Sequence, residues 1–175
     1  MTPAKLKLNR VFGFSLLLAL GFLGGYFWPR PVGVSQRLVV EQVIDGDTLE
    51  VKIAGKPERV RLIGVDTPEI AHSSEEKSEC FGPEAAQYLQ GILEQELIYL
   101  VRDPSTSERD KYQRLLRYVF LEDGTLVNAK LIEEGYGFLY IYQPFQFMKQ
   151  FDYFEKEARR QKKGLWSEEC FYYFE

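Results

Sequence analysis

The stretch VIDGDTLEVKIAGKPERVRLIGVDTPE, residues 43–69, decides the fold of this chain. Two alternating apolar segments, 49–53 and 59–65, are separated by the turn-forming residues AGKPE, a pattern typical of paired β-strands. An acidic cluster stands at each end of the pair, DGDT at 45–48 and DTPE at 66–69. Either these clusters are ordinary acidic turns, or the fold brings their carboxylates together around a cation.

The rest of the chain adds further strands and then helices. Strand patterns also lie at 37–44 and 97–103, and a hairpin around Asp123-Gly124 is predicted to join 113–121 to 125–127. Apolar residues at helical spacing predict helices at 82–95, 127–135 and 146–163, whereas residues 70–80 are polar and are predicted to form a loop. This order favours an α+β fold, a small five-stranded OB-fold barrel with packed helices.

The composition excludes several classes of protein. A length of 175 residues predicts one domain, and 13 Phe and 11 Tyr can supply a sizeable core. One His and two Cys nearly exclude a zinc site of the usual Cys/His type, and a Ser-His-Asp mechanism would have to depend on His72 in the polar loop. Acidic groups outnumber basic ones from residue 37 onward, which is the wrong sign for bulk attraction of nucleic acid.

Residues 1–28 have the features of a membrane-targeting segment. Three basic residues precede an apolar run, 11–28, that contains no charge. As a helix rising ~1.5 Å per residue, this run nearly crosses a hydrocarbon core of ~30 Å. We expect a signal-anchor, a single hydrophobic helix at 1–28, followed by a linker at 29–36. A cleaved secretory signal is the alternative. The remaining domain would lie outside the cytoplasm in both cases, anchored to the membrane or secreted.

A set of motifs in residues 37–170 resembles one known family. The segments DGDT, RLIGVDTPE, FGPEA, DKYQRLLRYV, LVNAKLIEEGYG, YIYQP and GLWSEE follow one another along this range. Their identity, order and spacing are similar to those of the staphylococcal nuclease (thermonuclease) family. The resemblance implies a five-stranded OB-fold barrel with three packed helices at 37–170, and leaves 171–175 as a C-terminal tail.

The resemblance also implies a calcium site made from both acidic clusters. Asp47, Asp66 and the backbone carbonyl of Thr67 match the family's calcium ligands, and calcium prefers oxygen donors of these kinds. Glu69 matches the proposed general base, which accepts a proton from the water that attacks phosphorus. Either cluster alone would be an ordinary turn, because Asp is common at turns. Together, at the ends of adjacent strands, they favour a metal.

Two arginines match the family residues that hold the scissile phosphate, Arg61 and Arg114. A guanidinium group suits this role because it stays charged and offers forked donors to phosphate oxygens. The alternatives are a strand arginine paired with an acid for Arg61 and an ordinary hairpin arginine for Arg114. The family commonly has Gly before the second arginine, whereas this chain has Gln113, which could alter the backbone of the loop.

Four further residues match the positions that line the family's nucleotide pocket: Lys111, Tyr112, Tyr140 and Tyr142. Tyrosine faces can stack on bases, and lysine can neutralise a terminal phosphate. Tyr140 and Tyr142 could equally be core or barrel-rim residues in a chain this rich in aromatic side chains.

The two cysteines, Cys80 and Cys170, could form a disulfide in an extracytoplasmic setting if the C-terminal segment packs beside the helix at 82–95. Two unrelated thiols are the alternative.

The resemblance predicts a calcium-dependent nuclease that hydrolyses phosphodiester bonds of DNA and RNA and leaves 3′-phosphorylated products. We expect a monomer that contacts its nucleic acid substrate, with the membrane as a partner through the N-terminal helix and no obligate protein partner. The alternative is a non-catalytic OB-fold module that binds nucleic acid. The presence of both acidic clusters and both arginines favours the enzyme.

Overall fold

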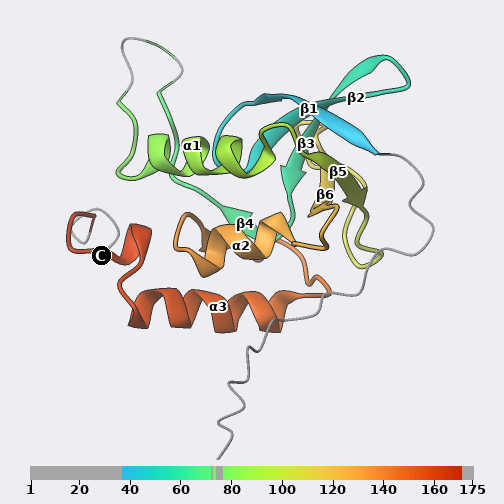
Figure 1. The fold of residues 1–175 in the computed structure, drawn as a ribbon. Helices are drawn as coiled ribbons and strands as arrows, with labels where there is room; N and C mark the ends of the chain where they lie inside the picture. The colour runs from blue at the N-terminus through green and yellow to red at the C-terminus, as the bar shows by residue number, and fades with distance from the viewer. Residues whose placement is uncertain (1–36, 72, 74–76, 171–175) are drawn as a thin grey trace, which may run out of the picture.

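A computed structural model describes residues 37–71, 73 and 77–170. Its centre is a closed barrel of five strands in the order β1-β2-β3-β6-β5 (Figure 1). The strands are β1 (Leu38–Val43), β2 (Thr48–Ile53), β3 (Lys56–Leu62), β5 (Leu97–Val101) and β6 (Leu115–Leu121). The predicted five-stranded barrel is confirmed, and its strand order is consistent with the OB type.

The first three strands form an antiparallel meander, and the later strands close it. Thr48 of β2 pairs with Arg61 of β3, and the chain turns between these strands at Ala54-Gly55, where φ is 51° and 79°. β3 then runs parallel to β6, with Arg61 opposite Leu116, and β5 pairs with both β6 and β1. The parallel pair places the end of β3 beside the start of β6, where two of the predicted site residues lie.

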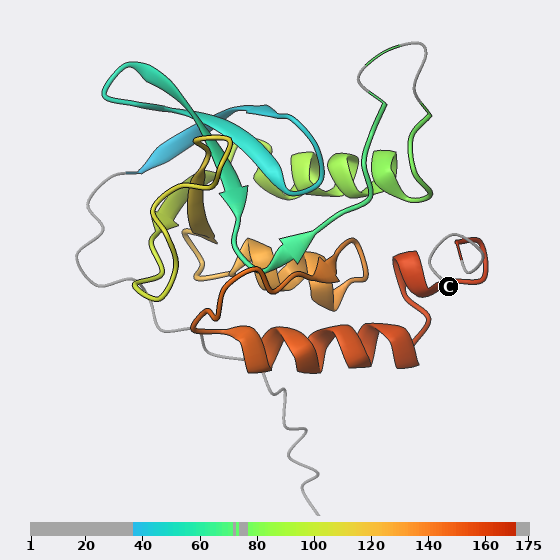
Figure 2. The same cartoon turned by 180° about the vertical axis from the view of Figure 1, so that it is seen from behind.

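The described chain has three helices, of which the first two pack against the barrel and the third packs against the second. They are α1 (Gly82–Leu93), α2 (Val127–Glu133) and α3 (Met148–Arg160), followed by a short 3-10 turn, η1 (Gly164–Trp166). Figures 1 and 2 both show α2 lying between the barrel and α3. A separate two-stranded sheet pairs β4 (Val65–Asp66), which follows β3 where the chain leaves the barrel, with β7 (Phe138–Leu139).

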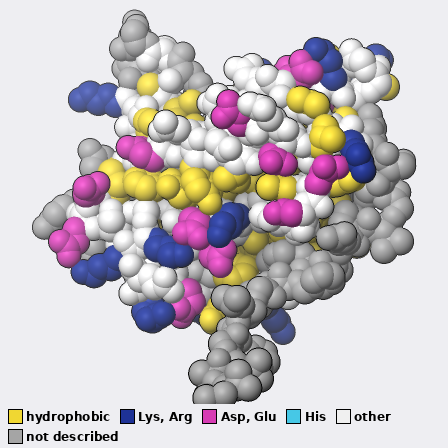
Figure 3. Space-filling model, in the orientation of Figure 1, with side chains coloured by type: hydrophobic (Ala, Val, Ile, Leu, Met, Phe, Trp, Pro, Cys, Tyr) yellow, Lys and Arg dark blue, Asp and Glu magenta, His cyan; other side chains and the backbone are white. Residues whose placement is uncertain are grey.

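One hydrophobic core runs from the barrel interior to the helices. Leu49 and Val51 of β2 and Val60 and Leu62 of β3 are buried because alternate residues of each strand point inward. Phe151 of α3 is buried in the same cluster. Figure 3 shows an apolar strip along the junction of α1 and α2, with charged side chains on either side. The barrel and the helices therefore share one continuous interior.

The structure corrects the sequence-based boundaries in a few places. The predicted hairpin to 125–127 is wrong, because α2 already begins at Val127 and only an isolated bridge joins Phe120 to Leu126. β3 begins at Lys56, inside the predicted turn. The N-terminal hydrophobic helix, the linker and the tail at 171–175 lie outside the described residues. Within the described part, no helix is long and apolar enough to span a membrane.

Candidate active site

The two acidic turns of the opening stretch lie against each other. The β1–β2 turn carries Gly46, and a Cβ atom added there would lie 2.7 Å from Oγ1 of Thr67 in the second turn. Close approach of two backbones is a typical reason for glycine at such a position. The fold therefore brings both acidic turns together at one end of the barrel.

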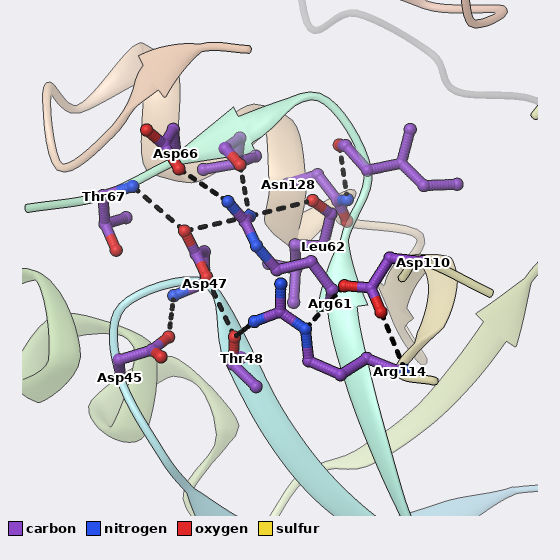
Figure 4. A network of polar contacts seen from close by, with 12 residues as sticks. Asp45, Asp47, Thr48, Arg61, Leu62, Asp66, Thr67, Asp110, Arg114 and Asn128 are labelled. Carbon is purple, nitrogen blue, oxygen red and sulfur yellow. Dashed lines mark hydrogen bonds and ion pairs between the residues drawn. The ribbon is translucent and has the colours of Figure 1, made fainter. Parts of the chain in front are cut away.

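Asp47 is the buried centre of this junction (Figure 4). Its Oδ2 accepts a hydrogen bond from the backbone N–H of Thr67 at 3.1 Å, and its Oδ1 accepts one from the Thr48 hydroxyl at 3.0 Å. Its own N–H donates to Oδ1 of Asp45 at 2.9 Å, and its carbonyl accepts the N–H of Leu62 at 2.9 Å. These contacts fix the Asp47 carboxylate between the two turns.

Arg61 joins the carboxylates of the two turns. It lies on β3, and its side chain is largely buried. Nη1 is 2.9 Å from Oδ2 of Asp47 and also donates to the carbonyl of Val65, while Nη2 is 2.6 Å from Oδ1 of Asp66. A forked guanidinium can meet two carboxylates in this way, whereas an ammonium group offers no such geometry. Asp47 and Asp66 therefore lie on either side of one cationic group.

Arg114 reaches the same junction from the loop just before β6. Its Nε donates to Oδ2 of Asp110 at 2.7 Å, and its Nη1 donates to the hydroxyl of Thr48 at 3.2 Å. Gln113 before it has φ of 66°, the left-handed region that glycine adopts readily, and Arg109 donates to the Gln113 carbonyl at 2.6 Å. Gln113 therefore takes the backbone conformation that a glycine would favour, and Arg114 points toward the acidic turns.

Glu69 lies just beyond β4, on the loop that leads to α1. Its backbone N–H donates to Oε2 of Glu79 at 3.0 Å, and its carbonyl accepts the N–H of Glu79 at 2.9 Å. The first residue of α1, Gly82, approaches so closely that a Cβ there would lie 2.5 Å from the Glu69 carbonyl oxygen. The backbone of Glu69 is therefore fixed, while its side chain is exposed to solvent.

The carboxyl groups of the site carry more negative charge than the nearby cations offset. Burial raises the pKa of Asp47, although Arg61 opposes this and Asp45 adds to it. Burial likewise raises the pKa of Asp66 above its ordinary value despite the contacts with Arg61. Partial burial of the largely exposed Glu69 raises its pKa, and the neighbouring carboxylates of Asp45 and Asp66 raise it further. Each of these carboxyl groups would be stabilised in its charged form by one more cation.

The donor set suits a hard cation. Two carboxylates, from Asp47 and Asp66, and the backbone carbonyl of Thr67 are oxygen ligands of the kind calcium prefers. Nowhere in the described part of the chain do three or more His, Cys, Asp or Glu side chains form a group that could hold a metal ion. The calcium set expected here contains only two carboxylates, so these residues fit calcium through their oxygen chemistry and their uncompensated charge.

The predicted pocket tyrosines lie at the surface and not in the core. The side chains of Tyr112, Tyr140 and Tyr142 are 67%, 47% and 78% exposed. The Arg114 guanidinium lies 5.3 Å from the ring centroid of Tyr112, the Lys111 amine lies 4.8 Å from it, and the Arg61 guanidinium lies 6.0 Å from the Tyr140 ring. Tyr112 and Tyr140 therefore border the two arginines, whereas Tyr142 is the most exposed of the three tyrosines.

Comparison with known proteins supports the resemblance seen in the sequence. The family described as "Staphylococcal nuclease homologue" matches residues 59–168. The chain belongs to the staphylococcal nuclease family. It is 35% identical over 133 residues to the thermonuclease of Staphylococcus hyicus, a match that covers 75% of this chain and 76% of that protein.

Two further relatives of the family come from Bacillus subtilis strain 168. The endonuclease YncB is 34% identical over 135 residues, with 74% of this chain and 61% of that protein covered. The endonuclease YhcR is 32% identical over 139 residues, but the match covers only 11% of that protein.

Several residues that support the site were not predicted from the sequence. Asp110 holds Arg114, and its i,i+4 spacing to that arginine was the available signal. Asn128 of α2 donates to the carbonyls of Ile63 at 3.0 Å and Arg117 at 3.1 Å, so it ties the end of β3 to β6. In the sequence, Asn128 is marked only as a polar residue between Val127 and Ala129, which does not reveal these distant partners.

Proposed function

We propose that this protein is a calcium-dependent nuclease that hydrolyses phosphodiester bonds of DNA and RNA and leaves 3′-phosphorylated products. Nuclease activity, a hydrolase activity, is supported by the chain's membership of the staphylococcal nuclease family and by its relatives that are named as nucleases. The observation that carries the proposal is the convergence of Arg61 and Arg114 on adjacent residues. Arg61 contacts Asp47 at 2.9 Å, and Arg114 contacts Thr48 at 3.2 Å.

Asp47, Asp66 and the carbonyl of Thr67 would hold the calcium ion. Bound there, calcium would act as a Lewis acid that polarises a phosphate oxygen and offsets negative charge. Asp47 suits a ligand because Thr67 and Thr48 already orient its two carboxylate oxygens. An oriented ligand loses little freedom when a cation binds, which favours affinity.

Arg61 and Arg114 would bind the phosphate that is cleaved. Arg61 lies on β3 and Arg114 lies just before β6, and their carboxylate partners hold both in place, Asp47 and Asp66 for Arg61 and Asp110 for Arg114. Fixed donors of this kind stabilise charge that develops in a phosphoryl transition state.

Glu69 would accept the proton of the attacking water. Its carboxylate reaches solvent, while its backbone is held by Glu79 and lies against Gly82. A general base needs such a fixed position within hydrogen-bonding reach of the water. The exposed rings of Tyr112 and Tyr140 beside the arginines would stack on bases, as would the exposed ring of Tyr142, and Lys111 beside Tyr112 would neutralise a terminal phosphate.

We further propose that residues 1–28 hold the protein in the membrane, or direct its secretion if they are cleaved, with the nuclease domain outside the cytoplasm. The disulfide between Cys80 and Cys170 supports this setting, because disulfides persist in oxidising compartments. The protein would act as a monomer. N-terminal sequencing of the mature protein tests the anchor, since a start between Phe22 and Arg37 would mean that the segment is removed.

Digestion of single-stranded DNA, duplex DNA and RNA, with calcium or with a chelator, tests the activity. We expect cleavage that requires calcium and fragments that carry 3′-phosphate. Arg61→Lys and Arg114→Lys should each lose most activity, because a lysine keeps the charge but loses the forked geometry. Arg117→Lys is the matched control, since Arg117 pairs with Glu108 away from the acidic turns. Binding of nucleic acid without cleavage would favour the OB-fold binding module instead.

A further inference from the structure

We propose that the Cys80–Cys170 disulfide positions Glu69, by anchoring the short segment that holds the Glu69 backbone. This inference rests on the proposed function, in which Glu69 is the general base. It makes the disulfide a positioning element of the site, and it makes cleavage depend on the redox state of a bond that lies outside the site.

The segment after the loop, residues 78–82, holds the backbone around Glu69. Glu79 makes two hydrogen bonds with Glu69, from its N–H to the Glu69 carbonyl at 2.9 Å and from the Glu69 N–H to its carboxylate at 3.0 Å. Ser78 accepts the N–H of Ala71 at 2.9 Å, and Gly82 lies against the Glu69 carbonyl. Any shift of this segment therefore moves Glu69.

The segment itself has few other attachments at its centre. Cys80 follows Glu79 directly, and its Cα lies 5.8 Å from that of Cys170 in the disulfide. Phe81, the N-cap residue of α1, has φ of 72° and gives the helix no side-chain cap. Apart from the disulfide, the Phe81 ring supplies the lateral contacts of the segment: it lies 5.3 Å from the ring of Tyr136 and also against Gly164. A left-handed Phe stores local strain, so the segment depends on the contacts that hold it.

The other end of the disulfide lies in a firmly packed part of the fold. Cys170 is buried and follows η1, where the N–H of Leu165 donates to the carbonyl of Gly135 at 2.9 Å. A Cβ added at Gly164 would lie only 2.2 Å from that same carbonyl oxygen. Figure 2 shows this C-terminal turn on the same side of the molecule as the loop between β4 and α1. The disulfide therefore joins the Glu69 segment to the α2–α3 body.

Reduction would release this anchor. A dithiol reductant supplies two electrons and two protons, so the Sγ–Sγ bond breaks, Cys80 and Cys170 become thiols, and the reductant becomes a disulfide. The two arginines are held by groups outside the segment, Arg61 by Asp47 and Asp66 and Arg114 by Asp110. Turnover should therefore fall, while calcium and substrate still bind.

A double-mutant cycle on the full chain in detergent tests the proposal, with saturating calcium and at a temperature where all variants are folded. We expect Cys80→Ser/Cys170→Ser to lower kcat at least tenfold, since a displacement of about 1 Å can cost up to 10²-fold, with KM changed less than about twofold. In a Glu69→Gln background the same double substitution should change kcat little, because its effect passes through Glu69. Equal effects in both backgrounds, or an unchanged kcat, would overturn the proposal.

Two controls separate positioning from general loss of stability. Ile98→Ala in β5 removes buried core volume away from the loop and should leave kcat unchanged. Glu79→Ala should lower kcat with the disulfide intact, and Glu79→Gln should restore most of it, because the amide oxygen can still accept the Glu69 N–H. A loss of kcat in Ile98→Ala equal to that of the double serine variant would refute positioning.

Hydrogen exchange gives a result that does not depend on cleavage. The amides of Glu69 and Glu79 should exchange faster in Cys80→Ser/Cys170→Ser, while the amide of Val119, bonded to Asn128, should not change. If Glu69→Gln cleaves like the wild type, the proposed function fails, and these amides still decide whether the disulfide anchors the segment. Unchanged exchange at both amides would show that it does not.

Discussion

We predict that Asp103→Asn lowers the unfolding free energy by about 3–5 kcal/mol. Asp103 follows β5 and its side chain is 0% exposed. Its Oδ2 accepts the hydroxyl of Tyr118 on β6 at 2.6 Å and the backbone N–H of Gln146 at 2.7 Å, and its Oδ1 accepts the N–H of Ser105 at 2.7 Å. This one carboxylate therefore joins the barrel to the segment that leads into α3.

The magnitude follows from the donors that face Asp103. An asparagine side chain has a single acceptor oxygen, which can face the N–H of Gln146 or that of Ser105 but not both. Its NH2 group then faces the other backbone N–H, so two donors lie against each other. A hydrogen bond to a charged group contributes about 1.5–3 kcal/mol, and a buried N–H left without an acceptor costs about 1–3 kcal/mol. Tyr118→Phe removes a single bond and leaves two backbone donors in place, so its cost should be about 1.5–3 kcal/mol.

The loss should also depend on pH in a defined direction. Burial alone would raise the pKa of Asp103, but the hydrogen bonds from Gln146, Tyr118 and Ser105 together lower the pKa below its ordinary value of 3.8. A carboxyl group whose pKa is lower in the folded state than in the unfolded state stabilises the fold when the pH is above its unfolded-state pKa. This stabilisation is lost as the pH falls through the folded-state pKa. The difference between wild type and Asp103→Asn should therefore shrink below about pH 4.

Guanidinium unfolding followed by far-ultraviolet circular dichroism, at about pH 7 and about pH 3, measures both effects. Asp123→Asn is the control, because Asp123 lies at an exposed turn, where its Oδ1 accepts the N–H of Thr125 at 2.8 Å. We expect the control to change the unfolding free energy by less than about 0.5 kcal/mol. A similarly small change of the unfolding free energy in Asp103→Asn at neutral pH would show that the Asp103 carboxylate does not hold these donors together. A difference between wild type and variant that stays constant with pH would show the same.

Three further predictions concern single features of the backbone and the disulfide. Gln113→Gly should keep the unfolding free energy within about 1 kcal/mol of wild type and retain cleavage, because the relief of strain at φ of 66° offsets the entropy of glycine; a tenfold loss of cleavage would contradict this. Gly46→Ala should cost about 1–3 kcal/mol in denaturant unfolding and weaken calcium dependence, because its Cβ would lie 2.7 Å from Oγ1 of Thr67; wild-type values of both would contradict it. Cys80→Ser/Cys170→Ser should cost about 4 kcal/mol in the same assay, because the disulfide joins residues 90 apart; a cost below about 1 kcal/mol would contradict it.

Much of the fold could be predicted from local patterns. The alternation in 49–53 and 59–65 identified β2 and β3, and the helical spacing in 146–163 identified α3. The parallel pairing of β3 with β6 has no local signal, because Val60 and Leu115 are far apart in sequence. β4 and β7 contain two residues each, too few for an alternating pattern.

The site was predicted only as far as residue types and a resemblance allow. The two acidic turns indicated where oxygen ligands would gather, but the contact of Arg61 with both Asp47 and Asp66 depends on how β3 bends into β4. Asn128 and Asp103 each bond to groups distant in the chain, 65 residues away for the Ile63 carbonyl and 43 for the N–H of Gln146. The sequence around Asn128 and Asp103 does not indicate such distant partners, so the roles of these two residues could not be predicted.

The rate of cleavage by Glu69→Gln at saturating calcium decides whether Glu69 is the general base. The amide keeps the size and much of the hydrogen bonding of Glu69 but cannot accept the proton of water, so we predict a rate lower by about 10²–10⁴-fold. Calorimetric titration of the same sample should show that calcium still binds, because Asp47 and Asp66 are unchanged. Turnover by Glu69→Gln equal to that of the wild type would show that Glu69 is not the general base.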